Sequence, residues 1–249
     1  RLDPTKLVPN AKSIICLAYN YFRDVTQDND TYKIAMYAQG KDYHKVLKKK
    51  LKQVWREIFE LLGKEEKNKA RYFVDSAPIL ERQWAERAGL GWTGKNTLLI
   101  NPKVGSYFFL AEIITTVELI YNEKVMDDHC GTCTRCIDAC PTDAIAPDGY
   151  LLKADQCISY FTIEAKSDVT EPYKEKLDGW IFGCDICQQV CPWNKFSSAH
   201  DESQFQNKID ISNWTKDDWR SLSQNDFEKN FSDTPLKRAG LEKIKKVML

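Results

Sequence analysis

The sequence predicts an α+β protein in which a mixed α/β domain is followed by a cysteine-rich module and by the start of a helical C-terminal region. Three observations predict this order. Short apolar runs and amphipathic helical patterns alternate through residues 1–124. Eight of the nine cysteines fall in the next segment, residues 125–195. A helical spacing of Leu241, Ile244 and Val247 or Met248 then closes the last segment, residues 196–249.

The first domain is expected to begin with a strand and a long helix. Residues 13–19 form an apolar run that suits a buried strand. Residues 42–62 repeat apolar side chains at three- and four-residue steps, which predicts an amphipathic helix that ends at Gly63. The remaining elements are expected to be strands at 71–74, 96–100 and 107–119, and a helix at 79–88 that Gly89 and Gly91 close.

Composition and charge exclude several classes of protein. Lys plus Arg and Asp plus Glu both total 36, so the net charge indicates no partner. No apolar stretch approaches about 18 residues, so no membrane span is expected. The first residues also lack the apolar region of a signal peptide. Crowded cysteines in a chain of this length indicate metal ligands in a reducing compartment, so we expect a cytoplasmic protein, with Cys16 as a buried core thiol.

The spacing of the other eight cysteines is the strongest chemical signal in the sequence. One run follows the bacterial ferredoxin pattern C-x2-C-x2-C-x3-C-P, in which the fourth cysteine ligates the other cluster. A second run, C-x2-C-x3-C-P, has a detached first member at Cys157. Crossing the two runs predicts two 4Fe–4S clusters, one on Cys130, Cys133, Cys136 and Cys191, and the other on Cys140, Cys157, Cys184 and Cys187.

Structural zinc is the alternative, because paired cysteines also make zinc ribbons. A ribbon needs two CxxC pairs, whereas here a third cysteine follows after two residues and a fourth precedes a proline. Soft thiolates at this spacing therefore favour iron–sulfur clusters. Two such clusters relay single electrons but bind no organic substrate, so residues 1–124 are expected to supply what receives the electrons.

The first domain carries no nucleotide-binding fingerprint, because no GxGxxG follows a strand. Asp42-Tyr43-His44 resembles the start of the Asp-x-His-x-x-Gly motif of B12 proteins, but Leu47 stands where the glycine would be. That departure argues against a histidine beneath cobalt. His44 is therefore expected to be a partly solvated helix residue.

Asp75 admits two interpretations. It ends an apolar strand and precedes a helix start, which fits a helix-capping carboxylate. The same placement on rigid elements suits a general acid whose pKa is set by its pocket. Arg82, which lies further along that helix, is more typical of a surface or salt-bridged residue than of a ligand contact.

Four stretches of the sequence together resemble the epoxyqueuosine reductase family. They are YAQGKDYH (37–44), VDSAPILER (74–82), GWTGKNTLLI (91–100) and GWIFGCDICQQVCPWN (179–194). The resemblance covers nearly the whole chain. It implies a nitroreductase-like first domain that binds cobalamin with no histidine beneath the cobalt, which agrees with the broken motif at His44. The family extends beyond both ends of this sequence, with a helical-repeat domain after its last residue.

The resemblance also implies a reaction and its residues. The reaction is the reductive opening of the epoxide of epoxyqueuosine, at the wobble position of tRNA, which gives queuosine and water. Asp75 would take the role of proton donor, and Arg82 would lie close to the lower face of the cobalt. Ser159, Asp185 and the loop at Asn96 would contact the corrin. A low-potential electron donor is implied as a further partner, and a monomer is expected.

Two local concentrations of basic residues are compatible with an RNA partner. Residues 41–56 hold Lys41, Lys45, Lys48, Lys49, Lys50, Lys52 and Arg56 against one acid, and the tail holds Lys237, Arg238, Lys243, Lys245 and Lys246 against Glu242. A helix that merely solvates one face with lysine would show a similar pattern. An RNA enzyme of this kind would read an unstacked base in the anticodon loop.

Two other functions remain open from the sequence. A ferredoxin-type electron carrier or subunit would need only the cysteine module and would leave residues 1–124 as a docking domain. A reductive dehalogenase would share both cofactors, but such enzymes are typically exported with a twin-arginine signal, and none is visible here.

Overall fold

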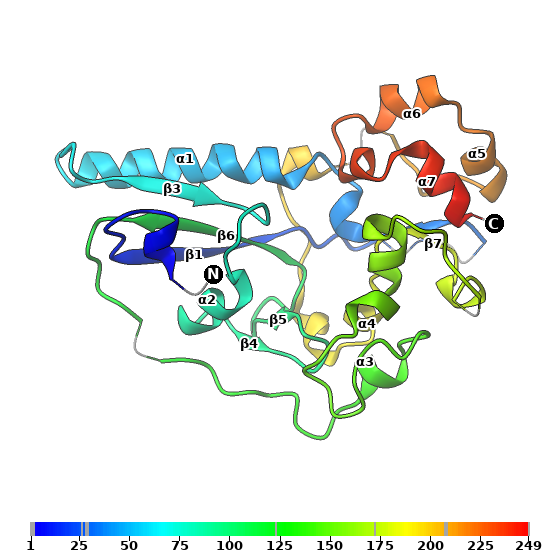
Figure 1. The fold of residues 1–249 in the computed structure, drawn as a ribbon, viewed down its shortest axis with the longest axis horizontal. Helices are drawn as coiled ribbons and strands as arrows, with labels where there is room; N and C mark the ends of the chain where they lie inside the picture. The colour runs from blue at the N-terminus through cyan, green and yellow to red at the C-terminus, as the bar shows by residue number, and fades with distance from the viewer. Residues whose placement is uncertain are drawn as a thin grey trace.

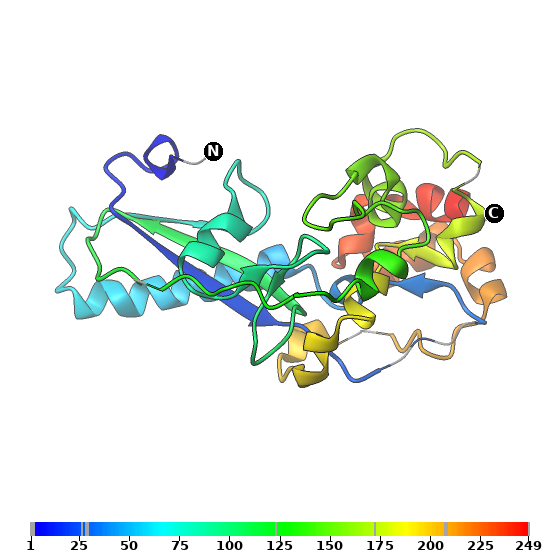
Figure 2. The same ribbon diagram turned by 90° about the horizontal axis from the view of Figure 1, so that it is seen from below.

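The computed structural model describes residues 3–25, 27, 30–122, 124–171, 173–206 and 209–248. Two lobes are visible when the molecule is seen from below (Figure 2). One lobe holds the long sheet and the longest helix. The other holds the cysteine-bearing loops and the C-terminal helices.

The principal sheet has three antiparallel strands, β1 (Ser13–Asn20), β3 (Ala70–Phe73) and β6 (Phe108–Thr115). Their order is β1-β6-β3, so β6 is central and pairs with β1 from Ser13↔Thr115 to Asn20↔Phe108. Seven of the eight residues of β6 are buried, because both faces of this strand are covered by helices. The expected strands at 13–19, 71–74 and 107–119 are thus confirmed, although the last ends four residues earlier.

Helix α1 (Tyr43–Leu61) covers one face of this sheet, as Figure 1 shows. It begins where the side chain of Asp42 accepts a hydrogen bond from the amide of His44, and it ends before Gly63, which has a φ of 73°. Its buried face carries Leu47, Leu51 and Trp55, which pack in one cluster with Ile113 of β6. The helix predicted at 42–62 is therefore confirmed.

Helix α2 (Glu81–Arg87) lies on the opposite face of the sheet, next to a short hairpin of β4 (Trp92–Thr93) and β5 (Leu99–Ile100). The strand expected at 96–100 is wrong in its first half. Residues 94–98 form the turn between β4 and β5, where Gly94 N–H donates to the carbonyl of Leu98 and Thr97 has a φ of 65°. Gly94 and Asn96 are turn-forming residues, and the strand prediction gave too much weight to the apolar residues 98–100 that follow them.

The second lobe is built from segments that are far apart in the sequence. Strand β2 (Lys33–Ile34) pairs in parallel with β7 (Trp180–Phe182), and one apolar core joins residues near Ile34, Trp180 and Trp219. The other α-helices are α3 (Arg135–Asp138), α4 (Ile186–Gln189), α5 (Lys216–Ser221), α6 (Gln224–Phe231) and α7 (Gly240–Val247). The expected terminal helix is confirmed by α7, in which Leu241, Ile244 and Val247 are buried.

Short helical turns connect these elements. They are η1 (Pro4–Lys6), η2 (Met36–Ala38), η3 (Ala154–Gln156), η5 (Glu175–Leu177), η6 (Pro192–Phe196), η7 (Ser203–Phe205) and η8 (Pro235–Arg238), with a π-helical turn η4 (Tyr160–Glu164). Phe205 of η7 packs with α1 and the sheet, so the chain returns to the first lobe after the cysteine module. The division at 124/125 and 195/196 stays a prediction. Among the helices described, none is both long and apolar enough to cross a bilayer.

Candidate functional site

Eight thiols divide between two adjoining cavities. The first cavity is lined by Cys130, Cys133, Cys136 and Cys191, and the second by Cys140, Cys157, Cys184 and Cys187. All eight are half-buried free thiols. This grouping is the one expected if the last cysteine of each run ligates the cluster of the other run. The identity of the bound metal stays a prediction.

Neither group of thiols converges on a single metal-sized point in the described structure. In the parts of the chain that the structure describes, no three His, Cys, Asp or Glu side chains lie close enough together to ligate one metal ion. In a 4Fe–4S cluster each thiolate binds a separate iron, so the four sulfurs need not converge on one point.

Lys95 fixes the loop that carries the first thiols. Its ammonium group donates hydrogen bonds of 2.7 Å to the carbonyl of Gly131 and 3.1 Å to that of Cys133. Asp128 accepts a 2.7 Å hydrogen bond from the Cys130 amide on the other side of the loop. The sequence analysis did not single out Lys95, since its partners are backbone carbonyls more than thirty residues away.

The second cavity is the larger of the two, about 650 Å³, and brings together all four residues expected to contact a corrin. Arg82, Asn96, Ser159 and Asp185 line it, although they come from four different loops or helices. Its volume is that of a cofactor or ligand pocket, which commonly measures roughly 300–1,000 Å³. The described lining contains no histidine.

Asn96 and Asp185 are fixed by backbone contacts. Asn96 is buried, lines both cysteine cavities, and donates a 3.4 Å hydrogen bond to the carbonyl of Cys187. Asp185 is 3% exposed and accepts a 2.7 Å hydrogen bond from the amide of Met36. Burial raises the pKa of Asp185 to about 7.

Arg82 is exposed on α2, and its guanidinium group donates to the carbonyl of Thr97 in the β4–β5 turn. Of the two alternatives expected for it, a surface or a salt-bridged residue, the structure shows the first, since no ion pair joins it to another described residue. The head group is instead held at the mouth of the second cavity.

Asp75 is placed by the strand end and by α1. The hydroxyl group of Tyr43 donates a 2.7 Å hydrogen bond to Oδ2 of Asp75. Nε2 of His44 lies 3.7 Å from the same oxygen. The helix-capping interpretation is wrong, because α2 begins at Glu81 after Leu80 and has no side-chain cap. The Asp75 side chain remains 55% exposed, which leaves it accessible to a substrate.

Neighbouring groups set the protonation of this cluster. Burial acts to raise the pKa of Asp75, but the adjacent His44 and the hydrogen bond from Tyr43 outweigh it and hold that pKa below its usual value. The carboxylates of Asp42 and Asp75 raise the pKa of His44 to about 9. His44 is half-buried on α1, as expected, but its contact with Asp75 was not foreseen.

Tyr37 connects Asp75 with the second cavity. Its ring lines the cavity and makes an edge contact with the Tyr43 ring at a centroid distance of 6.1 Å. Burial, followed by the charges of Asp185 and Asp75, raises the pKa of Tyr37. Asp75 itself is not among the residues that line the cavity, and its contact with Tyr43, which touches Tyr37, connects it to that lining.

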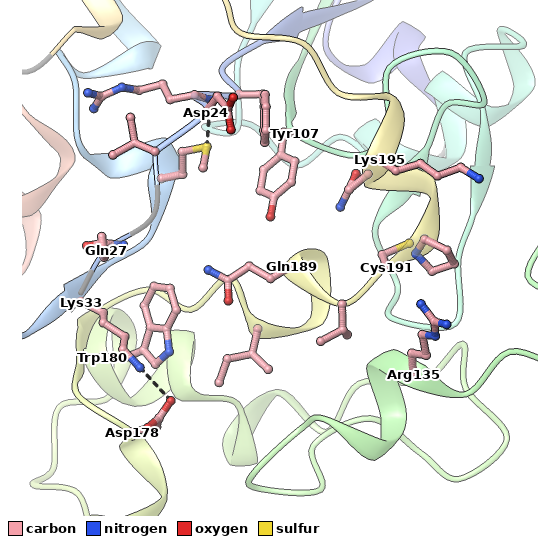
Figure 3. Close-up of a pocket in the computed structure, with 18 residues that line it drawn as sticks. Asp24, Gln27, Lys33, Tyr107, Arg135, Asp178, Trp180, Gln189, Cys191 and Lys195 are labelled. Atoms are coloured by element: carbon pink, nitrogen blue, oxygen red, sulfur yellow. Dashed lines mark hydrogen bonds and ion pairs between the residues drawn. The ribbon is translucent and has the colours of Figure 1, made fainter. Parts of the chain in front are cut away.

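A third cavity, of about 930 Å³, lies against Cys191. Figure 3 shows Arg135, Lys195 and Cys191 along one wall, and Lys33 paired with Asp178 at the opposite side. The distance between Lys33 Nζ and Asp178 Oδ2 is 3.0 Å. Arg135 also lines the first cysteine cavity, so this positively charged wall adjoins those thiols.

The two basic segments differ in how many of their charges are paired. Lys45, Lys48, Lys49, Lys52 and Arg56 are exposed along α1, and Lys48 Nζ donates a 3.1 Å hydrogen bond to Ser76, beside Asp75. In the tail, Arg238 pairs with Glu164 at 2.8 Å and Lys246 with Asp168 at 3.6 Å. The α1 segment therefore offers more free positive charge.

Two family models match the chain. The first, described as "Epoxyqueuosine reductase QueG, DUF1730", matches residues 1–76. The second, described as "4Fe-4S double cluster binding domain", matches residues 129–194. The second match supports a domain that binds two 4Fe–4S clusters. Which cysteine binds which cluster stays a prediction.

Curated relatives and solved structures carry the same family name. The chain is 49% identical to "Epoxyqueuosine reductase" from Cyclobacterium marinum, over 97% of this chain and 76% of the relative. It is 48% identical to the protein of that name from Cellulophaga algicola, over 98% and 79%. A crystal structure of epoxyqueuosine reductase with an epoxyqueuosine-modified tRNA stem loop aligns with a TM-score of 0.86 and 32% identity, over 100% of this chain and 66% of that one.

Proposed function

This chain belongs to the epoxyqueuosine reductase family, and from that membership we propose that it reduces epoxyqueuosine to queuosine in tRNA. The alternatives of an electron carrier or a reductive dehalogenase are not favoured, since the relatives are named for the reductase. The observation that carries the proposal is the second cavity, which has four thiols on one side and Tyr37, the neighbour of the Asp75 cluster, on the other.

The reaction needs two electrons and two protons for each epoxide. The epoxide oxygen leaves as water, and a carbon–carbon double bond forms in the cyclopentane ring. Two 4Fe–4S clusters would supply these electrons one at a time. One would be held by Cys130, Cys133, Cys136 and Cys191, and the other by Cys140, Cys157, Cys184 and Cys187.

Cobalamin is the second cofactor of the proposal. When bound, it supplies a strongly reducing metal centre between the clusters and the substrate. Arg82, Asn96, Ser159 and Asp185 would hold the corrin, since all four face the cavity of about 650 Å³ beside the second thiol group. Asn96 and Asp185 are already fixed by backbone hydrogen bonds, which suits a site formed in advance of cofactor binding.

One of the two protons is proposed to come from the pair of Asp75 and His44, and the other from solvent. Because the pKa of His44 is raised and that of Asp75 is lowered, the shared proton rests on His44 at neutral pH. Asp75 is the more exposed partner, so it faces the substrate and passes the proton to the departing oxygen. Tyr43 holds the carboxylate in place during this transfer.

Electrons are proposed to enter beside Cys191. Of the two thiol groups, only the second shares the corrin cavity, so the first is the one that an external protein would reduce. The cavity against Cys191 is walled by Arg135 and Lys195 (Figure 3), which favours a low-potential donor with an acidic surface.

The tRNA is proposed to lie along α1 with its anticodon loop over Asp75. Lys48 reaches Ser76 at 3.1 Å, and the charge of Arg238 acts on Asp75 from the C-terminal segment. Positive charge from two segments therefore borders the exposed carboxylate on which the flipped base would be placed. We also expect a monomer in the cytoplasm, where thiolates stay reduced.

The direct test is reconstitution. The chain would be loaded anaerobically with iron, sulfide and cobalamin, given a low-potential reductant, and mixed with tRNA that carries epoxyqueuosine. Mass analysis of the digested nucleosides should show the loss of one oxygen atom. A chain that retains both cofactors through gel filtration but leaves epoxyqueuosine unchanged would refute the proposal.

A further inference from the structure

Glu112 is a carboxylic acid in the centre of the principal sheet. It lies in β6, between Cys16 of β1 and Phe73 of β3, and its exposed fraction is 0%. Neither of its carboxylate oxygens has a hydrogen-bond partner among the described residues. A buried polar group without a partner is costly, so its presence on the central strand calls for a reason.

The side chain of Glu112 points toward α2. Side chains alternate along a strand, and Phe108, two pairs of residues before Glu112, packs with Ala85 of α2. Glu81, the first residue of α2, interacts with Glu112 through its carboxyl group. The two acids lie within hydrogen-bonding reach once one of them carries a proton, and no donor among the described residues reaches the Glu112 carboxyl group.

Glu81 also holds the Asp75 loop. Its Oε1 accepts a 2.6 Å hydrogen bond from the backbone amide of Asp75. Asp75 has a φ of 50°, a left-handed conformation that disfavours residues with a side chain and must be maintained by surrounding contacts. The hydrogen bond to Glu81 is one such contact, and the bond from Tyr43 to the carboxylate is the other.

Two adjacent carboxyl groups in a buried site do not both ionise. Burial, together with the charge of Glu81, raises the pKa of Glu112 to about 9, and burial raises that of Glu81 as well. The other titratable groups that face the pair are Asp75, His44 and the Cys16 thiol, whose own pKa is raised to about 12. Cys16, expected to be fully buried, is half-buried here.

We propose that Glu81 and Glu112 share one proton and act as positioning residues that keep the Asp75 loop in its reactive geometry. Glu112 carries the proton and turns its hydroxyl toward Glu81, and Glu81 stays an acceptor for the Asp75 amide. The inference rests on the proposed role of Asp75 as proton donor. Neither glutamate touches the substrate in this arrangement.

The experiment compares three variants of the reconstituted chain. Glu112→Gln keeps a donor toward Glu81, whereas Glu112→Leu fills the same space without one. Glu86→Ala is the matched control, because Glu86 is a carboxylate on the same helix that accepts a 2.9 Å hydrogen bond from Thr93 instead. The readouts are hydrogen exchange of the amides in residues 74–80, the infrared band of a protonated carboxylic acid, and turnover.

The proposal predicts that Glu112→Leu folds, exchanges the Asp75 amide faster, and loses turnover by about tenfold or more with an unchanged KM for tRNA. Glu112→Gln should lose the infrared band but keep the exchange rate and the turnover of the unchanged protein. The Glu86→Ala control should keep the exchange rate of the unchanged protein. Equal behaviour of the Leu and Gln variants, or a protein with no protonated-carboxyl band to lose, would overturn it. Exchange and infrared spectra need no substrate, so they decide the inference even if the protein reduces no epoxyqueuosine.

Discussion

The hydroxyl group of Tyr43 donates a 2.7 Å hydrogen bond to Asp75, while the ring of Tyr43 stacks on Phe109 at a centroid distance of 4.1 Å. The start of α1 and the central strand β6 thus meet at the carboxylate of Asp75, two residues after β3 ends. Asp75 is oriented by tertiary contacts on three sides although it lies in a loop. Because neighbouring residues orient Asp75, their contribution can be measured by substituting them while Asp75 is kept.

Tyr43→Phe removes only the hydroxyl group and keeps the ring stacked on Phe109. Turnover should fall by about tenfold, since an oriented carboxylate loses one of its two side-chain partners. The free energy of unfolding should fall by only about 1 kcal/mol. Chemical denaturation and single-turnover rates would check this, and an unchanged rate would show that Tyr43 does not orient the donor.

Activity should depend on the proton that His44 holds. The pKa of His44 is raised to about 9, so the proton is present below that pH and is lost as pH rises through it. Single-turnover rates should therefore fall on the alkaline side near pH 9. His44→Gln should remove this alkaline limb and slow the reaction by about a hundredfold. A variant with the full rate and the same limb would place the titrating group elsewhere.

The two cysteine groups can be separated by substitution. Cys136→Ser should remove one cluster and Cys184→Ser the other, so each variant should keep about four of roughly eight irons. Cys16→Ser is the control and should keep all of them, since Cys16 lies on β1 in the sheet. Zinc in the purified protein, or the same iron loss from Cys16→Ser, would contradict the assignment.

The basic face of α1 should bind RNA by charge. Reversing Lys45 and Lys49 to Glu should weaken tRNA binding and lower its salt dependence, because the counterions that phosphate contacts release would be fewer. Lys67→Glu is the control, since Lys67 is exposed beyond the far end of α1. The test is the affinity for tRNA measured over a range of salt concentrations. If Lys67→Glu weakened binding as much as the reversal of Lys45 and Lys49, the basic face of α1 would not be the RNA-binding surface.

Much of this site could be predicted from the sequence because its strongest signals are local. The cysteine spacing anticipates both thiol groups, and the apolar periodicity anticipates α1 within a residue at each end. Contacts between distant segments gave no such signal. The bond from Lys95 to the Gly131 loop and the burial of Glu112 beneath α2 both depend on how segments distant in the sequence pack together. The turn at Asn96 was missed although Gly94 and Asn96 favour a turn, because the apolar residues that follow were read as one strand with Asn96.

The account depends most on Asp75 as the group that delivers the proton to the epoxide oxygen. The decisive measurement is the mass of the nucleoside after one turnover by Asp75→Asn, loaded with both cofactors and compared with the unchanged protein under the same reductant. The account predicts that this variant keeps its iron and its corrin absorption and leaves epoxyqueuosine intact. Queuosine formed at the unchanged rate would contradict it.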